Sequence, residues 1–271
     1  MELKSLLKKK ILTKIVVLIS AMALIIGSLV LTKEGKSDKV SGTEARTVKP
    51  CPFKKPAYES FYNLYVKRIL DIVISGIFLL FTWPLLLISG AAIFLEDGLP
   101  IFYRAERGGY QGKPFRIMKF RSMIKDADKV GGGTTALHDE RITRTGNILR
   151  KTKLDEFPQF IQVFTGEMSL IGPRPELLRY TDQYEGDEKK ILMVRPGITD
   201  YSSIEFINLD EIVGGENADE MYEKYVLKRK NELRVKYAET VSFRTDAYIF
   251  CKTAYKVLEK IYGFFIKKEH Q

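Results

Sequence analysis

Two long apolar segments constrain the fold of this 271-residue chain more than any other feature. The first, IVVLISAMALIIGSLVLT at residues 15–32, has no charged residue over 18 positions, about the minimum for a helix that crosses a bilayer. Lysines flank it on both sides and no A-x-A cleavage site follows, which favours a retained anchor over a cleaved secretory signal. We therefore expect an additional N-terminal transmembrane helix within a membrane anchor at residues 1–32.

The second apolar segment runs from Ile69 to Leu95, with Asp71 near its start and Pro84 close to its middle. A proline removes one helical hydrogen bond and clashes with the preceding turn, so Pro84 predicts a kink. A kinked apolar helix can span a membrane, or it can dip into one face and return.

The distribution of lysine and arginine bears on the choice between these two paths. Residues 33–68 carry nine of them, against five before the first apolar segment, which favours a cytoplasmic linker. If the large downstream domain lies on the same side, the second segment must be a re-entrant helix, which we place at residues 66–95. The alternative is a hairpin of two spans with the linker outside.

Charge and composition exclude several classes of function. Residues 1–70 hold 14 Lys/Arg against 5 Asp/Glu and so carry nearly all of the net charge of +10, next to the apolar segments rather than on a folded face. No nucleic-acid partner is therefore expected. Two widely separated cysteines and two histidines give no disulfide framework, zinc site or His-supported nucleophile, and no HExxH motif occurs, which disfavours a peptidase.

The rest of the chain alternates between short strand and helix patterns. Residues 33–60 read as a polar, basic linker. PIFYRAE (100–106) and KPFRIMKFRSM (113–123) flank the turn sequence GGYQG, which predicts a β-hairpin. TDAYIFCKTAYKVLEKIYGFFIKK, near the C-terminus, predicts a basic amphipathic helix that packs on the domain or lies in a lipid interface.

Two adjacent carboxylates stand out in RKTKLDEFPQF at residues 150–160. The apolar spacing predicts two helices that meet at Leu154–Asp155, and Pro158 fits only a first helical turn. Asp155 and Glu156 should then lie at or just before a helix N-terminus. If Asp155 is the N-cap, Pro158 offers it no N–H at the third helical position, which leaves its carboxylate less committed to local hydrogen bonds. An ordinary helix start would use the same residue types.

Basic residues on stiff turns accompany the acidic pair. Arg174 lies between two prolines in MSLIGPRPE (168–176), and VRPGITD (194–200) holds a second arginine beside proline and glycine. A guanidinium on a rigid turn suits bidentate phosphate recognition. With Lys119, Arg121 and Arg150, the chain offers several cations that can converge on an acidic ligand.

These motifs resemble, in their order, the bacterial sugar transferase family of monotopic phosphoglycosyl transferases. They are KRILD, the proline-broken helix, FYRAERGG, FRIMKFRSM, LRKTKLDEFPQ, GEMSLIGPRPE and RPGIT. The resemblance covers residues 61–262, which we take as the transferase domain, followed by a basic tail at 263–271. It implies an α+β fold, mostly helical with a small sheet and a re-entrant helix.

The resemblance implies transfer of a sugar-1-phosphate from a nucleotide-diphospho-sugar, expected to be a UDP-sugar, to undecaprenyl phosphate. It further implies magnesium and a covalent phosphosugar-aspartate intermediate, and so assembly of exopolysaccharide, capsule, O-antigen or another glycoconjugate. The catalytic residues would be Asp155 as nucleophile and Glu156, both also candidate metal ligands. The phosphate-binding residues would be Lys119, Arg121, Arg150 and Arg174.

The expected location is the bacterial inner membrane, with the catalytic domain facing the cytoplasm. The expected partners are the nucleotide-sugar donor, a polyprenyl phosphate acceptor, membrane lipid and other glycan-assembly enzymes. DYSSIEFINLDEIVGG, which follows RPGIT, departs from the family pattern and is expected to influence the choice of sugar or nucleotide. A non-catalytic membrane scaffold for polysaccharide assembly is the alternative; it explains the first 70 residues but leaves the acidic pair and its arginines unexplained.

Overall fold

A computed structural model describes residues 56–127, 139–209, 212, 214 and 218–267. The predictions for the anchor at 1–32, for nearly all of the linker at 33–60 and for the last four residues of the tail lie outside the described residues. The domain treated below is the unit that begins at Lys55.

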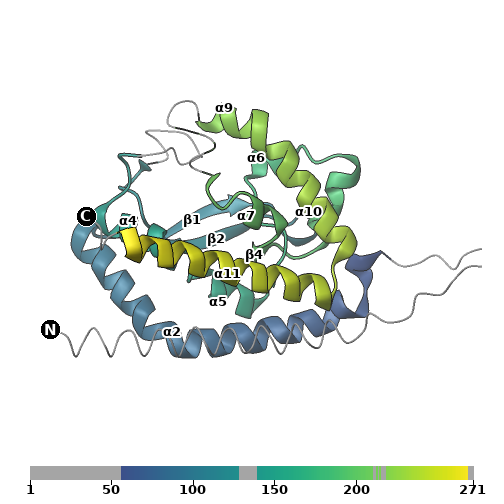
Figure 1. The fold of residues 1–271 in the computed structure, drawn as a ribbon, viewed down its shortest axis with the longest axis horizontal. Coiled ribbons are helices and arrows are strands. Elements are labelled where there is room, and N and C mark those ends of the chain that lie inside the picture. Colours follow the sequence, from purple (N-terminus) through teal and green to yellow (C-terminus); the bar gives the residue numbers. More distant parts are fainter. Residues whose placement is uncertain (1–55, 128–138, 210–211, 213, 215–217, 268–271) are drawn as a thin grey trace, which may run out of the picture. The chain divides into compact units, whose positions relative to one another are not determined.

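The described domain is α+β and mostly helical, as predicted (Figure 1). It has two small sheets: β1 (Phe102–Arg107) pairs antiparallel with β2 (Phe115–Phe120), and β3 (Ser169–Ile171) pairs parallel with β4 (Gly197–Thr199). The helices are α2 (Lys67–Asp97), α4 (Arg144–Thr152), α5 (Gln159–Thr165), α6 (Leu178–Thr181), α7 (Tyr201–Glu205), α9 (Ala218–Tyr222), α10 (Lys228–Thr240) and α11 (Phe243–Lys267).

The predicted hairpin is confirmed. Phe102 pairs with Phe120 and Arg107 with Phe115 across β1 and β2. The connecting turn needs two residues with positive φ, and Gln111 (57°) and Gly112 (73°) supply them. The hairpin presents alternate side chains to the helices around it.

The start of α2 is tied to the domain by the charged residues of KRILD. Lys67 Nζ lies 2.5 Å from Asp246 Oδ2, Arg68 donates to the carbonyl oxygens of Val163 (2.6 Å) and Phe164 (2.8 Å), and Asp71 Oδ1 accepts from the Leu170 amide (3.0 Å). The three charges therefore join α2 to α11, to the end of α5 and to β3. Each has a defined partner, which explains polar residues at the start of so apolar a helix.

The C-terminal end of α2 is tied to the same domain. The Glu96 carboxylate accepts from the backbone amides of Arg144 (2.9 Å) and Thr145 (2.8 Å), which caps the first turn of α4. Asp97 forms an ion pair of 2.9 Å with Arg121 at the end of β2. Both ends of the helix are thus fixed by polar contacts.

Between these ends, α2 exposes large apolar side chains. Leu80, Phe81, Leu87, Ile88 and Leu95 are each at least 65% accessible, so the domain itself does not cover this surface. Within the described residues, Tyr62–Asp97 is the one helix long and apolar enough to cross a membrane. Figure 1 shows the α2 ribbon changing direction along its length. That Pro84 causes this turn, and that the helix is re-entrant, stay predictions.

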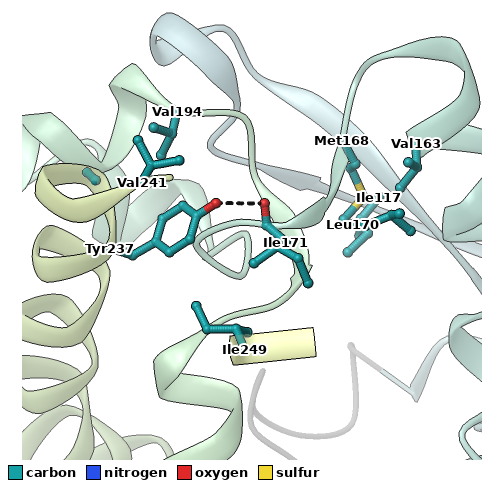
Figure 2. Close-up of a cluster of buried hydrophobic side chains, with 10 residues drawn as sticks. Ile117, Val163, Met168, Leu170, Ile171, Val194, Tyr237, Val241 and Ile249 are labelled. Atoms are coloured by element: carbon teal, nitrogen blue, oxygen red, sulfur yellow. Dashed lines mark hydrogen bonds between the residues drawn. The ribbon is translucent and has the colours of Figure 1, made fainter. Parts of the chain in front are cut away.

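The core lies between the small sheets, α5, α10 and α11. Its buried members include Val163, Met168, Ile171 and Ile249 (Figure 2). The Tyr237 hydroxyl donates to the Ile171 carbonyl at 3.1 Å, so β3 is held by a side chain of α10. Ile249 is fully buried, so α11 packs on the core.

Residues of α11 also face outward. Phe243, Tyr248, Phe250 and Tyr255 are all about half exposed or more. Of the two predictions for this helix, packing on the domain is confirmed, and a lipid-facing role for its outer side stays a prediction.

Candidate active site

The acidic pair lies in a break between two helices, as predicted. Lys153 takes a left-handed conformation (φ 60°) and ends α4, and residues Leu154–Glu156 form one 3-10 turn before α5. The N-cap of α5 is Pro158 rather than Asp155, because Asp155 already belongs to the preceding turn. The sequence had suggested that Asp155 is an N-cap whose carboxylate is left free because Pro158 has no N–H. Asp155 is not the N-cap, so this explanation for a free carboxylate does not apply.

One carboxylate oxygen of Asp155 nonetheless makes no hydrogen bond to the described residues. The residue is 8% exposed, and its Oδ1 is buried without a hydrogen-bond partner in the described part of the chain. Burial and the charge of Glu156 raise the pKa of Asp155, while Lys119, Lys153 and Arg150 act in the opposite direction. An oxygen that is buried and unpaired costs free energy, which makes it a candidate for a ligand, a metal or a covalent bond.

Glu156, the next residue, has the opposite environment. Its Oε2 accepts from Arg174 Nη1 at 3.0 Å, and its Oε1 accepts from Arg174 Nη2 and from Lys119 Nζ, the latter at 3.3 Å. Burial disfavours its charge, yet the charges of Arg174 and Lys119 outweigh this and hold the pKa of Glu156 well below its usual range. The carboxylate therefore fixes two cations beside Asp155.

Arg174 is placed by the two stiff turns that the sequence indicated. Gly172 and Gly197 bring GPRP and RPGIT into backbone contact: a Cβ at Gly197 would lie 2.1 Å from the Gly172 nitrogen. The Arg174 amide donates to Asp200 Oδ2 (3.1 Å), and its guanidinium donates to the Ile198 carbonyl (2.9 Å) as well as to Glu156. The orientation of this guanidinium is thus set by both turns.

The other predicted cations divide into two groups. Lys119, on β2, joins Glu156 and Arg174, and burial lowers its pKa against the attraction of Glu156. Arg150, on α4, donates to Ser122 Oγ at 3.4 Å, and its charge acts on Asp155. Arg121 does not join them: its Nη2 donates to the carbonyl oxygens of Asp97 (2.8 Å) and Gly98 (3.0 Å) at the end of α2. Its phosphate-binding role stays a prediction.

A second, deeper ionic network supports the GPRPE turn, and the sequence did not indicate it. Glu176 Oε2 accepts from Arg234 (3.0 Å) and from the Tyr222 hydroxyl (2.5 Å), and Arg234 Nε lies 3.9 Å from Asp200. Asp200 also caps α7 through the Ser203 amide at 2.7 Å. One buried arginine of α10 thus hydrogen-bonds to Glu176, two residues after Arg174, and lies close to Asp200, which accepts from the Arg174 amide.

Gln159 is a further residue that sequence reasoning left unassigned, although it belongs to the quoted LDEFPQ motif. Its side chain is fully buried, and neither its Oε1 nor its Nε2 has a partner among the described residues. It follows Asp155 by four positions and is the first residue of α5, just after the turn that holds the acidic pair. Its place in LDEFPQ was the only signal that the sequence offered, because burial and a missing partner are visible only in the folded chain.

The residues that follow the turn with Asp155 and Glu156 pack against the apolar helix α2. Phe78 of α2 stacks on Phe160 with ring centroids 3.7 Å apart and meets Phe157 edge-on at 4.9 Å. Phe157 directly follows Glu156, so the acidic pair lies next to the segment with the exposed apolar surface.

The fit of a metal can be tested on the same residues. Within the described residues no three His, Cys, Asp or Glu side chains gather into a metal-binding group. Both oxygens of Glu156 are occupied by cations, whereas Asp155 has an unpaired oxygen. Mg²⁺ is commonly held by one or two carboxylates together with substrate phosphates, and Asp155 fits that pattern better than Glu156 does.

Comparison with known proteins now adds to the geometry. The family described as "Bacterial sugar transferase" matches residues 62–260. The chain is 36% identical over 196 residues to the uncharacterized sugar transferase EpsL of Bacillus subtilis, which covers 72% of this chain and 88% of EpsL. It is 40% identical over 156 residues to the UDP-glucose:undecaprenyl-phosphate glucose-1-phosphate transferase of Escherichia coli, covering 55% of this chain and 33% of that protein.

The UDP-glucose:undecaprenyl-phosphate glucose-1-phosphate transferase of Caulobacter vibrioides is 32% identical over 195 residues, covering 71% of this chain and 69% of that protein. The similarity thus extends through nearly all of EpsL but only a third of the E. coli protein. The matched region holds every residue of the site described above. The chain therefore belongs to the bacterial sugar transferase family and is an enzyme of the phosphoglycosyl transferase class.

Proposed function

We propose that the protein transfers a sugar-1-phosphate from a nucleotide-diphospho-sugar to undecaprenyl phosphate, and so begins assembly of a polysaccharide or glycoconjugate. The observation that carries the proposal is the unpaired, buried Oδ1 of Asp155 beside the Glu156–Arg174–Lys119 cluster. An anionic nucleophile that attacks a diphosphate needs such cations, because they offset the repulsion between the two anions. The E. coli and Caulobacter relatives are glucose-1-phosphate transferases that act on undecaprenyl phosphate, which supports the same reaction class.

Asp155 is the proposed nucleophile. An Oδ atom attacks the phosphorus that bears the sugar, and the bond from that phosphorus to the bridging oxygen breaks. The nucleoside monophosphate leaves with the bridging oxygen, and the sugar phosphate remains on the Asp155 carboxylate. A phosphate oxygen of the polyprenyl acceptor then attacks the same phosphorus, which releases the carboxylate and forms the polyprenyl-diphospho-sugar.

The neighbouring residues have distinct proposed roles. Glu156 orients Arg174 and Lys119, and those cations bind the phosphoryl oxygens on which charge builds up. Mg²⁺ is the proposed cofactor, held by Asp155 and the donor phosphates, and when bound it would neutralise diphosphate charge. Binding of Mn²⁺ as a paramagnetic substitute can be measured without turnover, and we expect it to need both donor and the Asp155 carboxylate.

The test is release of nucleoside monophosphate by the purified full chain, given a panel of UDP-sugars, undecaprenyl phosphate and magnesium. We expect release from at least one donor, dependent on lipid acceptor and magnesium. Asp155→Asn should abolish it, while Asp182→Asn, at an exposed aspartate, should not. Full activity of folded Asp155→Asn protein would remove the nucleophile assignment, and an inactive panel of folded protein would point to an untested donor or to the scaffold alternative.

The two fixed ends of α2 support the proposed membrane-dipping arrangement, in which both ends of the helix stay on the side of the domain. One end contacts Asp246 and Leu170 and the other contacts Arg121 and Arg144, all in one domain. A helix that crossed the bilayer would have to separate these contacts by the thickness of the hydrocarbon core, about 30 Å.

The topology can be tested with a membrane-impermeant maleimide on intact cells. The chain would carry Cys251→Ser, so that Cys51 in the linker is the single target. We expect labelling only after the cells are lysed. Labelling of intact cells would place the linker outside and contradict the re-entrant path.

A further inference from the structure

Arg107, the last residue of β1, is fixed next to the GPRPE turn. It pairs with Phe115 in the hairpin and forms a separate β-bridge with Leu177. The following amide, of Gly108, donates to the Glu176 carbonyl at 3.1 Å. The backbone of Arg107 is therefore held on both sides.

The strand register places Arg107 on the same face of the hairpin as Lys119. Residues that alternate along a strand share a face, so Arg107 and Tyr103 lie together, and Tyr103 is paired with Lys119. Arg107 and Lys119 are then about 14 Å apart along the strands, at about 3.4 Å per residue. The charge of Arg174 acts on both of them, which places it near each. The three cations form a row that begins beside Asp155.

Arg107 is half-buried, and one of its guanidinium nitrogens is unpaired. Its Nη1 is buried, and no acceptor among the described residues lies within hydrogen-bond distance. Glu176, the carboxylate whose charge acts on it, already accepts from Arg234 and Tyr222. Glu156 is likewise bound to Arg174 and Lys119. The neighbouring carboxylates are thus already bound to other cations, and a guanidinium nitrogen that is buried without an acceptor indicates an anion that is supplied from outside.

We propose that Arg107 binds the phosphate of the nucleoside monophosphate part of the donor, at the end of the row Lys119–Arg174–Arg107 farthest from Asp155. The inference rests on the proposed function and adds a residue to it. When the bond to the bridging oxygen breaks, negative charge collects on the departing phosphate, and a guanidinium can meet two of its oxygens at once. Arg107 would then hold the leaving group while the sugar phosphate stays on Asp155.

The position of Arg107 favours the donor over the lipid as the source of this phosphate. The opposite end of the hairpin, at Phe120, packs with Ile93 of the apolar helix α2. The Arg107 end contacts Leu177 and α6 instead (Figure 1). A phosphate carried by a membrane lipid would arrive from the side of α2, whereas a soluble nucleotide can reach the other end of the row.

The test compares Arg107→Met with Arg104→Met in the full chain, purified in lipid nanodiscs. Arg104 lies on the same strand, exposed, and on the opposite face of the hairpin, so it is a matched control. We expect Arg107→Met to raise the KM for donor, and the inhibition constant of the released nucleoside monophosphate, by about tenfold or more. The KM for undecaprenyl phosphate and all values for Arg104→Met should stay within about twofold. A rise in the acceptor KM alone would assign the site to the lipid phosphate and overturn the proposal.

A binding measurement separates this proposal from the proposed function. Inorganic pyrophosphate is titrated calorimetrically into the wild-type chain and both variants, which requires no turnover. We expect Arg107→Met to bind it about tenfold more weakly, Arg107→Lys to lie in between, and Arg104→Met to match wild type. Equal affinity in Arg107→Met and wild type would overturn the anion site. Arg107-dependent binding by a chain that transfers no sugar would instead contradict the reaction and leave the anion site supported.

Discussion

The acidic turn at 155–156 and the start of α2 both place charged side chains in buried positions, but they satisfy them differently. At α2, Lys67, Arg68 and Asp71 each have a partner within 3.0 Å. In the acidic turn, Asp155 keeps an unpaired oxygen, and Gln159, four residues later at the start of α5, keeps an unpaired amide. The same chain thus uses buried charge for attachment in one place and leaves it available for a ligand in another. Buried charges that have partners, as at the start of α2, should stabilise the fold. Buried polar groups left without partners, as at Asp155 and Gln159, should destabilise it.

The largest expected effect on stability is at the attachment. Lys67→Met leaves the Asp246 carboxylate buried without its cation, and loss of one partner of such a pair costs about 3–5 kcal/mol. Chemical unfolding in detergent measures this loss. The double variant Lys67→Met/Asp246→Asn removes the stranded charge and should recover part of the stability. No recovery would mean that the ion pair is not what fixes α2.

Gln159 should behave in the opposite way. Gln159→Met keeps the volume of the side chain and removes two unpaired polar atoms, whose burial costs about 1–3 kcal/mol. We expect unchanged or greater stability in the same unfolding assay, together with lower transferase turnover. A clear loss of stability would show that the Gln159 amide has a structural partner and that it stabilises the fold, as the charges at the start of α2 do.

Asp155 and Glu156 allow the comparison to be made between neighbours. Because the pKa of Asp155 is raised, its contribution to stability is lost as the pH rises from the unfolded pKa, near 3.9, through the folded value. Asp155→Asn should therefore raise Tm at pH 7.5, by an amount that vanishes near pH 3.5. Thermal unfolding followed by fluorescence between these pH values is the measurement. A lower Tm for the variant at pH 7.5 would contradict the sign.

Glu156 should show the reverse dependence, with a smaller effect at low pH. Its pKa is lowered, so the stability that it contributes is present above its unfolded pKa, near 4.3, and is lost as the pH falls through the folded value. Glu156→Gln should lower Tm at pH 7.5 and have less effect below about pH 4. Equal effects at both pH values would mean that packing, rather than charge, is responsible.

Local sequence rules predicted much of this architecture. The hairpin followed from GGYQG between two β-prone runs, and the break at Leu154–Asp155 followed from Pro158 and the apolar spacing. Lys119 and Arg174 meet at Glu156 because the hairpin and the GPRP turn are stiff and their side chains long. These features depend on residues close together in sequence or on rigid backbone.

The remainder depends on contacts between distant segments. The sequence predicted Arg121 among the cations of the site. In the structure it pairs with Asp97, 24 residues earlier, at the end of α2, and no local pattern predicts that partner. Arg234 joins Glu176 across 58 positions, and no sequence pattern marks that pair. Likewise, whether Gln159 or Arg107 finds a hydrogen-bond partner is decided by the packed surroundings and not by either residue's own segment.

The attachment of α2 at both ends has a consequence for how the protein would respond to its lipid environment. An ordinary spanning helix adapts to bilayer thickness by tilting. A helix whose ends are fixed at Lys67 and at Glu96–Asp97 has no such freedom, because any tilt would break contacts with α4, α11 or β3. If α2 dips into one leaflet, as proposed, a thicker or thinner leaflet would instead raise or lower the whole domain, and with it the height of Asp155 relative to the lipid headgroups. Lipid composition could thereby set the catalytic rate without any change in the conformation of the enzyme.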